Sequence, residues 1–170
     1  MTAQSIRRLF FALWPNEVIQ HRLAEVARQL VDETQGKPIS WQNIHATLAF
    51  LGDVPVEQIP ALLNLAEQYR QFSCELVLDR VAVLNHGIVY AAATKPPTQL
   101  LDLATSLRSA LRESGYCIEH RRFLPHITLL RNSLQAPRQN VIAPIFWPLS
   151  GPRLVQSELR RAGAVYQLLS

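Results

Sequence analysis

The chain has 170 residues, of which 48% are hydrophobic and 18% charged, as is typical of a globular protein and unlike a disordered one. We expect one domain over residues 1–170. No apolar run approaches the roughly 18 residues of a membrane-spanning helix, and the first residues lack the order of regions in a signal peptide. The net charge of +4 is compatible with a phosphate-bearing partner, but many soluble proteins are equally basic.

The two cysteines, Cys74 and Cys117, are too few for a disulfide framework and lack the spacing of metal ligands. We therefore expect buried free thiols in a reducing cytoplasm.

Alternating helical and extended patterns predict an α+β fold. Asn16 is placed to cap a first helix, whose apolar stripe would be Val18, Ile19, Leu23, Val26 and Leu30. In chain order we expect a strand at 7–14, a helix ended by Gly36 and Pro38, a first motif strand at 44–51, a turn at 52–55, a helix at 57–69, a hairpin of strands 75–84 and 88–94, a helix from Pro97 to Gly115, a second motif strand at 125–131, a Pro-rich connection at 137–152, and strands at 153–159 and 164–169.

The two motif segments each place a histidine and a threonine two residues apart: His45 with Thr47, and His126 with Thr128. Apolar and β-branched residues surround both pairs, which predicts β-strands. Because side chains alternate faces along a strand, each imidazole and its hydroxyl would share a face, about 6.6 Å apart. Two such strands facing each other would line a pocket suited to acid–base chemistry on an anion.

A helix followed by a motif strand occurs twice, and the two histidines are 81 positions apart. We therefore expect a single bilobal domain: two pseudo-symmetric lobes of antiparallel sheet with outer helices, each giving its central strand to a shared cleft. The two halves align only over the motif, so a duplication of the chain is a hypothesis.

Longer strings surround the motifs. They are RLFFAL at 8–13, NIHATLAFLG at 43–52 after Trp41, RRFLPHITLLR at 121–131, and Ser157 with Tyr166 near the end. In this order the strings resemble the two-histidine phosphoesterase superfamily, and in particular its bacterial and archaeal RNA 2′,3′-cyclic phosphodiesterase branch, historically called 2′-5′ RNA ligase. The resemblance covers essentially the whole chain. Ala46, Arg122 and Leu124 depart from the family's common residues, none of them at a catalytic position.

The resemblance implies hydrolysis of RNA 2′,3′-cyclic phosphate ends, tRNA fragments among them, to 2′-phosphates by a monomeric enzyme without metal or cofactor. His45 would donate a proton to the departing 3′ oxygen, and His126 would accept one from water. The residue types suit this reaction, since imidazole can fill both roles near neutral pH. Thr47, Thr128 and Arg131 would hold the phosphate oxygens, Arg131 through its planar fork.

Other residues have simpler interpretations. A metal is the next rival for the histidines, but neither motif holds a third His, Cys, Asp or Glu. Most remaining arginines are expected to be solvated strand ends: Arg7, Arg8, Arg121, Arg122, Arg160 and Arg161. His21, His86 and His120 are expected to be structural, and Phe10, Phe11, Phe50, Phe123 and Trp41 are expected in the core, although one near the cleft could stack a base.

Two further functions stay open. One is a module that binds RNA ends or phosphate without turnover. The other is a phosphodiesterase of small cyclic nucleotides that also joins RNA through 2′-5′ bonds. The presence of both histidines favours turnover, because a Lys or Arg would hold a phosphate equally well.

Overall fold

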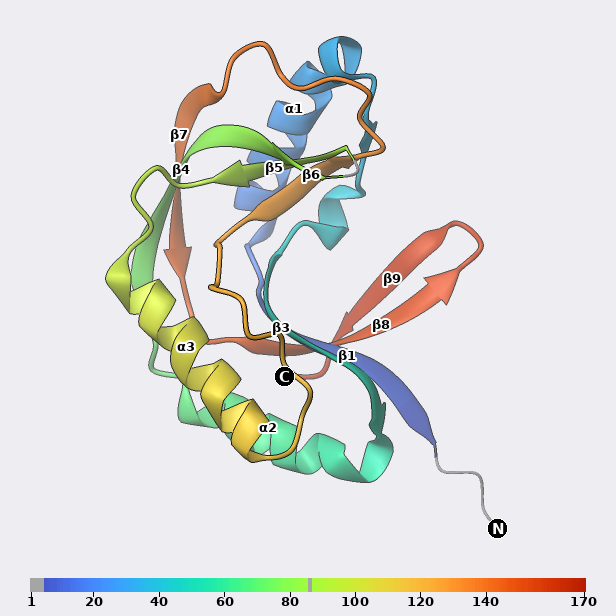
Figure 1. The fold of residues 1–170 in the computed structure, drawn as a ribbon, viewed down its shortest axis with the longest axis vertical. Coiled ribbons are helices and arrows are strands. Elements are labelled where there is room, and N and C mark those ends of the chain that lie inside the picture. The colour runs from blue at the N-terminus through green and yellow to red at the C-terminus, as the bar shows by residue number, and fades with distance from the viewer. Residues whose placement is uncertain (1–4, 86) are drawn as a thin grey trace.

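The computed structural model describes residues 5–85 and 87–170 as strands and helices around a common core (Figure 1). The two short segments η1 and η2 are single turns of 3₁₀-helix. The elements are β1 (Ile6–Leu13), α1 (Glu17–Thr34), β2 (Lys37–Pro38), η1 (Trp41–Asn43), β3 (Ala46–Pro55), η2 (Val56–Gln58), α2 (Ile59–Gln68), β4 (Cys74–Leu84), β5 (Ile88–Ala92), α3 (Thr98–Glu113), β6 (Ile127–Arg131), β7 (Val141–Leu149), β8 (Arg153–Arg160) and β9 (Gly163–Leu168).

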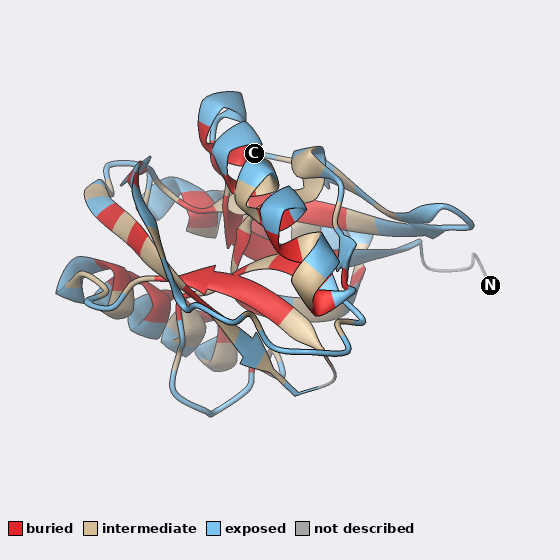
Figure 2. Cartoon of the chain, turned by 90° about the horizontal axis from the view of Figure 1, so that it is seen from above, coloured by how far each residue is buried: buried red, intermediate tan, exposed pale blue. Residues whose placement is uncertain are grey.

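Two antiparallel sheets form the framework. One has four strands in the order β3-β1-β8-β9, and the other has five in the order β2-β6-β5-β4-β7. One hydrophobic core includes residues of both sheets, such as Leu9 and Phe11 of β1 and Leu76 and Leu78 of β4. Buried positions concentrate on the strands and on the inward faces of the helices (Figure 2). The α+β prediction with antiparallel sheets is confirmed.

Helices α1 and α3 each pack on the sheet that does not contain the motif strand following them in the chain. Helix α1 precedes β3 of the four-stranded sheet, yet it packs on β2, β6 and β7 of the five-stranded one. Helix α3 precedes β6 of the five-stranded sheet, yet it packs on β3 of the four-stranded one, where α2 packs on β8. Each motif strand therefore follows a helix that covers the opposite sheet, which ties the two sheets into one unit.

The two motif strands occupy different places in their sheets. Strand β6 lies between β2 and β5, but β3 is the edge strand of the four-stranded sheet. The prediction that each lobe gives its central strand to the cleft is therefore wrong for β3. The centre of that sheet is held by β1 and β8, because β1 pairs with β3 on one side and with β8 on the other.

Helix α1 begins as predicted, with the Asn16 side chain accepting a hydrogen bond from the backbone N–H of Ile19 at 3.0 Å. Its C-terminal cap comes one residue before the predicted Gly36, because Gln35 adopts the left-handed conformation with φ of 55°. Val18, assigned to the apolar stripe, is 67% exposed instead. It lies in the first turn and is not among the residues that pack on the hydrophobic core.

Two segments predicted as irregular are strands. The expected turn at 52–55 is the end of β3, since Gly52, with φ of +76°, lies in the β3 backbone and the pairing with β1 runs on to Pro55. The expected connection at 137–152 contains β7, which pairs only with β4 among the described strands. Pro144 and Pro148 are tolerated there because an edge strand needs no donor on its free side.

The cysteines differ from their prediction in one respect. Both are free thiols, but Cys74 is half-buried at the start of β4 and Cys117 is exposed in the loop after α3. The prediction of buried thiols is therefore wrong for Cys117, whose loop lies at the surface. Within the described residues, no helix combines the length and the apolar composition needed to cross a membrane.

Candidate active site

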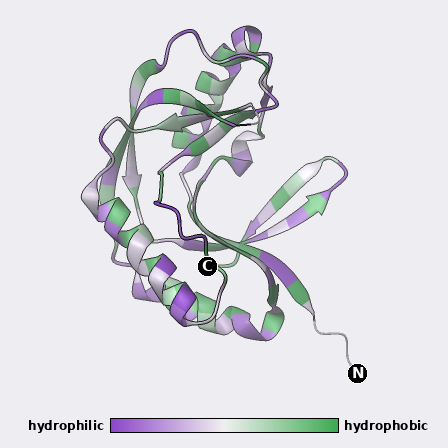
Figure 3. Cartoon of the chain, viewed as in Figure 1, coloured by the Kyte–Doolittle hydropathy of each residue, from purple (hydrophilic) through white to green (hydrophobic). Residues whose placement is uncertain are grey.

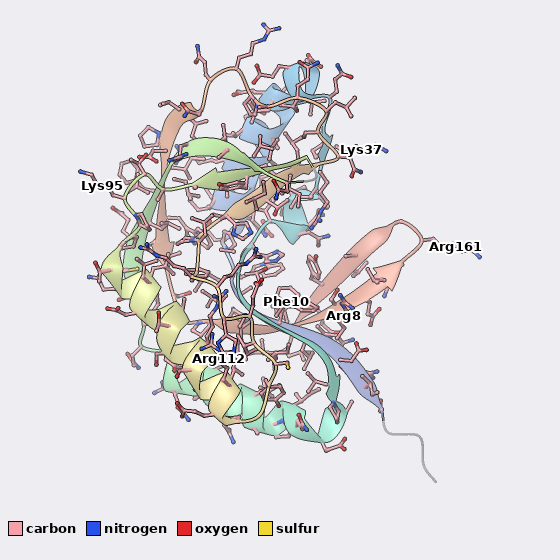
Figure 4. The ribbon with its side chains drawn as sticks, in the orientation of Figure 1. Arg8, Phe10, Lys37, Lys95, Arg112 and Arg161 are labelled. Atoms are coloured by element: carbon pink, nitrogen blue, oxygen red, sulfur yellow. The ribbon has the colours of Figure 1, made fainter. Side chains whose placement is uncertain are left out.

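A cavity of about 620 Å³ brings together the five side chains predicted for the site, His45, Thr47, His126, Thr128 and Arg131. Its wall is built from both sheets: β3 and β6 carry the motifs, while β1, β8 and β9 close one side. Arg8 and Phe10, both on β1, lie next to the β8–β9 hairpin in Figure 4. The other lining residues are Arg8, Phe10, Pro38, Ile39, Ser40, Asn43, Phe50, Ser157, Leu159, Ala162, Gly163, Ala164 and Tyr166.

The imidazole of His45 is fixed at both nitrogens. Nδ1 is 2.6 Å from the backbone carbonyl oxygen of Asn43, and Nε2 is 3.0 Å from Oγ1 of Thr47. The Asn43 side chain in turn donates from Nδ2 to the carbonyl oxygen of Ala164 in β9, at 2.8 Å. The residue two positions before His45 therefore orients the ring and also anchors this segment to the four-stranded sheet.

His126 is oriented in the same manner. Its Nδ1 is 2.8 Å from the backbone carbonyl oxygen of Leu124, again two residues earlier in the chain. A carbonyl oxygen can only accept, so Nδ1 carries the proton in the neutral form of both histidines. Each neutral ring therefore directs an Nε2 lone pair away from its anchoring carbonyl, and both rings line one cavity.

The surroundings of the two imidazoles are unequal. The ring of His45 stacks on Trp14 with centroids 5.1 Å apart and planes 3° apart, and it also contacts Phe10 and Tyr166. Of the rings in the described part of the chain, only Tyr90 contacts His126, edge-on at 5.6 Å.

Burial among these rings lowers the pKa of His45 to about 4, although the Asn43 carbonyl acts in the opposite direction. The positive charges of Arg131 and His126 lower this pKa further, which places both groups within electrostatic reach of His45. In the free protein His45 is therefore neutral at pH 7.

A β-bulge in β6 brings Arg131 to the site. Strict alternation would direct Arg131, five residues after His126, to the opposite face from the imidazole. Leu129 is an extra residue in the pairing of β6 with β5, so Leu129 and Leu130 are both buried. The phase of the strand then shifts, and Arg131 lines the cavity with Thr128.

Strand β3 carries a bulge at the matching position. Leu48 is an extra residue in the pairing with β1, and both Leu48 and Ala49 are buried. The shift returns Phe50 to the cavity, five residues after His45, with 47% of its surface exposed. The prediction of Phe50 as a core residue is therefore wrong. Phe50 occupies in the first motif the position that Arg131 holds in the second.

Arg8, predicted as a solvated strand end, is a cavity residue. The strand register places Arg8 opposite Ser157, and Ser157 opposite Tyr166, so the three form a row across β1, β8 and β9. The guanidinium of Arg8 lies 4.8 Å from the centre of the Phe50 ring. Sequence reasoning missed this row as a site, although all three residues belong to the strings that carry the family resemblance.

The predictions for the remaining aromatic residues and histidines have different outcomes. Phe11 is fully buried as predicted, and Phe10 is buried but also lines the cavity. Phe123 and Trp41 are partly buried against the core. His21 stacks on Trp41 with centroids 4.2 Å apart, outside the cavity, and His120 is exposed. His86 lies outside the described residues.

The other arginines behave as solvated strand ends or loop residues. Arg121 pairs with Glu119 at 2.8 Å, and Arg160 pairs with Glu158 at 2.9 Å. Arg7, Arg122 and Arg161 are exposed. Figure 4 shows Arg161 at the far tip of the β8–β9 hairpin, away from the body of the molecule.

Comparison with known proteins identifies the family. The profile described as LigT like Phosphoesterase matches residues 13–90. The RNA 2′,3′-cyclic phosphodiesterase of Escherichia coli (strain K12) is 39% identical over 132 residues, which cover 76% of this chain and 74% of that protein. The chain belongs to the LigT-like phosphoesterase family. The family prediction is confirmed.

One further relative and one solved structure match nearly the whole length of this LigT-like phosphoesterase. The RNA 2′,3′-cyclic phosphodiesterase of Thermus thermophilus is 31% identical over 95% of this chain and 87% of that protein. The crystal structure of E. coli LigT complexed with 3′-AMP superposes with a TM-score of 0.83 at 32% identity, covering 98% of this chain and 97% of that one. The likeness therefore includes both motifs and both sheets.

The donor groups of the site do not make up a set of metal ligands. Among residues 5–85 and 87–170, no three His, Cys, Asp or Glu side chains lie close enough together to hold a metal ion. Within this described part of the LigT-like phosphoesterase, the cavity wall contributes two histidines and no carboxylate.

Proposed function

We propose that this enzyme hydrolyses RNA ends bearing a 2′,3′-cyclic phosphate to 2′-phosphates, with His45 and His126 as the acid–base pair. One observation carries the proposal: two imidazoles, each directly before a strand of a different sheet and each anchored at Nδ1 by a carbonyl two residues earlier, line one cavity together with Arg131. The names of the E. coli and T. thermophilus relatives support the substrate class.

The proposed reaction uses both histidines in one displacement. Nε2 of His126 takes a proton from water, whose oxygen bonds to phosphorus as the bond from phosphorus to the 3′ oxygen breaks. His45 gives a proton from Nε2 to the departing 3′ oxygen, leaving a 3′ hydroxyl and a 2′-phosphate. The protonation states then exchange through solvent before the next turnover.

The acid role of His45 depends on the substrate. Its pKa of about 4 makes it neutral in the free protein at pH 7. A cyclic phosphate carries one negative charge, and an anion held beside Nε2 raises the pKa of a neighbouring imidazole. The cavity would thus protonate His45 when a phosphate arrives, which couples the acid to the presence of its substrate.

Arg131 and the two motif threonines would hold the phosphate oxygens on which charge accumulates. All three line the cavity beside the histidines. A guanidinium can donate to two oxygens at once, and a donor fixed before the reaction stabilises the transition state without rearranging. We propose that no metal takes part, because these groups already supply the charge stabilisation a metal would give.

The domain, the oligomeric state and the cellular compartment belong to the same proposal. We propose a single two-histidine phosphoesterase domain over residues 1–170 that acts as a monomer in the cytoplasm on RNA ends, tRNA fragments included. The free thiols Cys74 and Cys117 are in keeping with a reducing compartment.

The test is turnover of a short RNA that ends in a 2′,3′-cyclic phosphate, by the wild type and by His45→Ala and His126→Ala. We expect each variant to lose about 10²- to 10⁴-fold in kcat and the wild type to keep its rate in EDTA. Because both residues act in one step, the double variant should lose far less than the product of the single losses. Tight binding of the RNA without turnover would instead indicate a binding module, and EDTA inactivation reversed by a divalent ion would indicate a metal enzyme.

A further inference from the structure

A second cavity, of about 750 Å³, adjoins the catalytic one. The two share Thr47, Phe50 and His126, so the second begins at the wall where the reaction is proposed to occur. Most of its other residues come from β3, α3 and the loop between α3 and β6. They are Ala49, Leu84, Arg108, Cys117, Ile118, Glu119, Arg121, Arg122, Phe123 and Leu124.

The charge of this cavity is predominantly positive. Arg108, Arg121 and Arg122 line it against one carboxylate, Glu119, which Arg121 already neutralises at 2.8 Å. Figure 3 shows a hydrophilic stretch within the segment between α3 and β6. The arginine side chains of this loop are exposed and can move toward an anion in the cavity.

Exposed apolar surface lies beside these charges. Two apolar lining residues are exposed: Phe50 of β3 by 47%, and Leu124, two residues before His126 in the loop after α3, by 51%. Arg108 braces the lining of the cavity, since it donates to the Leu48 carbonyl at 2.8 Å and lies 5.0 Å from the centre of the Phe123 ring. Exposed aromatic and aliphatic groups next to arginines are the combination that binds single-stranded nucleic acid, through base stacking and phosphate contacts.

We propose that this second cavity binds the nucleotide on the 5′ side of the reacting end. The inference rests on the proposed function. An RNA whose cyclic phosphate lies between His45 and His126 has its terminal ribose in the catalytic cavity. The rest of the RNA strand, on the 5′ side of this ribose, must extend out of that cavity. The second cavity starts at His126 and offers guanidinium groups to the phosphodiester and Phe50 and Leu124 to the base.

The terminal nucleoside then occupies the part of the catalytic cavity that is lined by Arg8, Ser157 and Tyr166, none of which lines the second cavity. The two cavities therefore bind different nucleotides. A cyclic mononucleotide would fill only the catalytic cavity, whereas an oligonucleotide would fill both cavities. The site therefore predicts a preference for RNA over mononucleotides that resides in the loop between α3 and β6.

The experiment compares kcat/KM for a cyclic mononucleotide with that for a tetranucleotide ending in the same cyclic nucleotide. We expect the wild type to favour the tetranucleotide. The variant Arg121→Gln/Arg122→Gln should lower the ratio of tetranucleotide to mononucleotide kcat/KM by roughly tenfold, which corresponds to one or two lost charge-assisted contacts. Its kcat/KM for the tetranucleotide should also depend less steeply on salt.

Arg138→Gln is the matched control, because Arg138 is an equally exposed arginine in a different cavity, between α1 and β7. It should keep the wild-type ratio. An unchanged ratio in the double variant, or an equal fall with both substrates, would overturn the proposed site. Failure of the wild type to hydrolyse either substrate would overturn the proposed function itself, and that outcome is distinguishable because it precedes any comparison of variants.

Discussion

His45 and His126 show how surroundings can differentiate two identical side chains. Both are anchored at Nδ1 by the carbonyl two residues earlier. His45 is stacked on Trp14 and contacts Phe10 and Tyr166, and this burial lowers its pKa to about 4. Among the rings of the described residues, only Tyr90 contacts His126. At the residue scale, the division of labour that we propose for the two motifs therefore depends on what packs against the imidazole and not on the motif itself.

The pKa of His45 makes the stability of the fold depend on pH. The folded pKa of about 4 lies below the ordinary value of 6.5, so protons bind preferentially to the unfolded chain between these two values. The stability contributed by neutral His45 is complete above pH 6.5 and is lost as the pH falls toward 4. Between pH 7 and pH 5 the wild type should lose about 2 kcal/mol more than His45→Asn, measured by urea unfolding. Equal losses in the two proteins would show that His45 titrates normally.

Phosphate should reverse this depression of the pKa. We expect NMR titration of the His45 imidazole to give a pKa near 4 in the free protein and a clearly higher value with bound 3′-AMP, because the bound anion favours the charged ring. His21, which stacks on Trp41 outside the cavity, provides an internal control, because its NMR signals at a fixed pH should not move when the ligand is added. A His45 pKa that stays the same or falls on binding would contradict its proposed role as the acid.

Arg131 and Thr128 are expected to affect the rate without moving a proton. Arg131→Ala should lower kcat by about 10²- to 10³-fold, and Arg131→Lys should recover only part of this, since an ammonium keeps the charge and loses the fork. Thr128→Val keeps the β-branched shape and should fold normally with a reduced rate. The measurements are the pH profile of kcat and thermal melting. Full activity in Arg131→Ala, or a loss that only follows unfolding, would show that Arg131 is a solvated strand end.

At the element scale, the sequence predicts the strands better than their irregularities. The apolar runs around both motifs indicate strands, and the alternation from His45 to Thr47 and from His126 to Thr128 is confirmed. The bulges after the threonines depend on cross-strand pairing, which no local pattern reveals. For that reason the sequence pattern places Phe50 in the core, and simple alternation does not bring Arg131 to the cavity.

The edge strands show a second limit of local patterns. Pro144 and Pro148 favour an irregular connection, and only the position of β7 at a sheet edge makes a strand possible there. The row of Arg8, Ser157 and Tyr166 likewise depends on the order β1-β8-β9, because Arg8 is far from the other two in the chain. The sequence predicts local periodicity and the motif residues, but it does not predict the pairing of distant segments.

Helix α3 connects the two motifs through one side chain. Arg108 donates to the Leu48 carbonyl, next to Thr47 in β3, and to the Arg121 carbonyl in the loop that leads to His126, at 2.8 and 3.2 Å. Arg108→Met leaves both carbonyls without this donor and should lower the free energy of unfolding by about 1–3 kcal/mol. Because these hydrogen bonds join the segments that carry the two motifs, we expect kcat for a cyclic mononucleotide to fall as well.

Arg112→Met is the matched comparison. Arg112, labelled in Figure 4, donates to the carbonyls of Ile118 and Glu119 in the same loop and makes no hydrogen bond to β3 in the described part of the chain. It should lose stability with a much smaller change in kcat. Equal losses of kcat in both variants would show that Arg108 supports the loop without positioning the motifs.

At the scale of the whole molecule, the site exists because two sheets meet. One histidine directly precedes β3 of the four-stranded sheet and the other directly precedes β6 of the five-stranded sheet, while α1 and α3 each cover the sheet opposite to the motif strand that follows them. Neither sheet holds a complete acid–base pair. The proposed chemistry therefore requires the assembled fold, and under the proposal attack and departure would occur on different sides of the phosphorus.

The most direct test of this arrangement is the position of the phosphate in the product. A short RNA with a 2′,3′-cyclic phosphate is incubated with the wild type in EDTA, and the product is identified by ³¹P NMR. With His126 activating water and His45 protonating the 3′ oxygen, we expect a 2′-phosphate and a free 3′ hydroxyl, with no product from His45→Ala/His126→Ala on the same time scale. A 3′-phosphate, or a mixture of the two, would contradict the proposed placement of the histidines on either side of the reacting phosphorus.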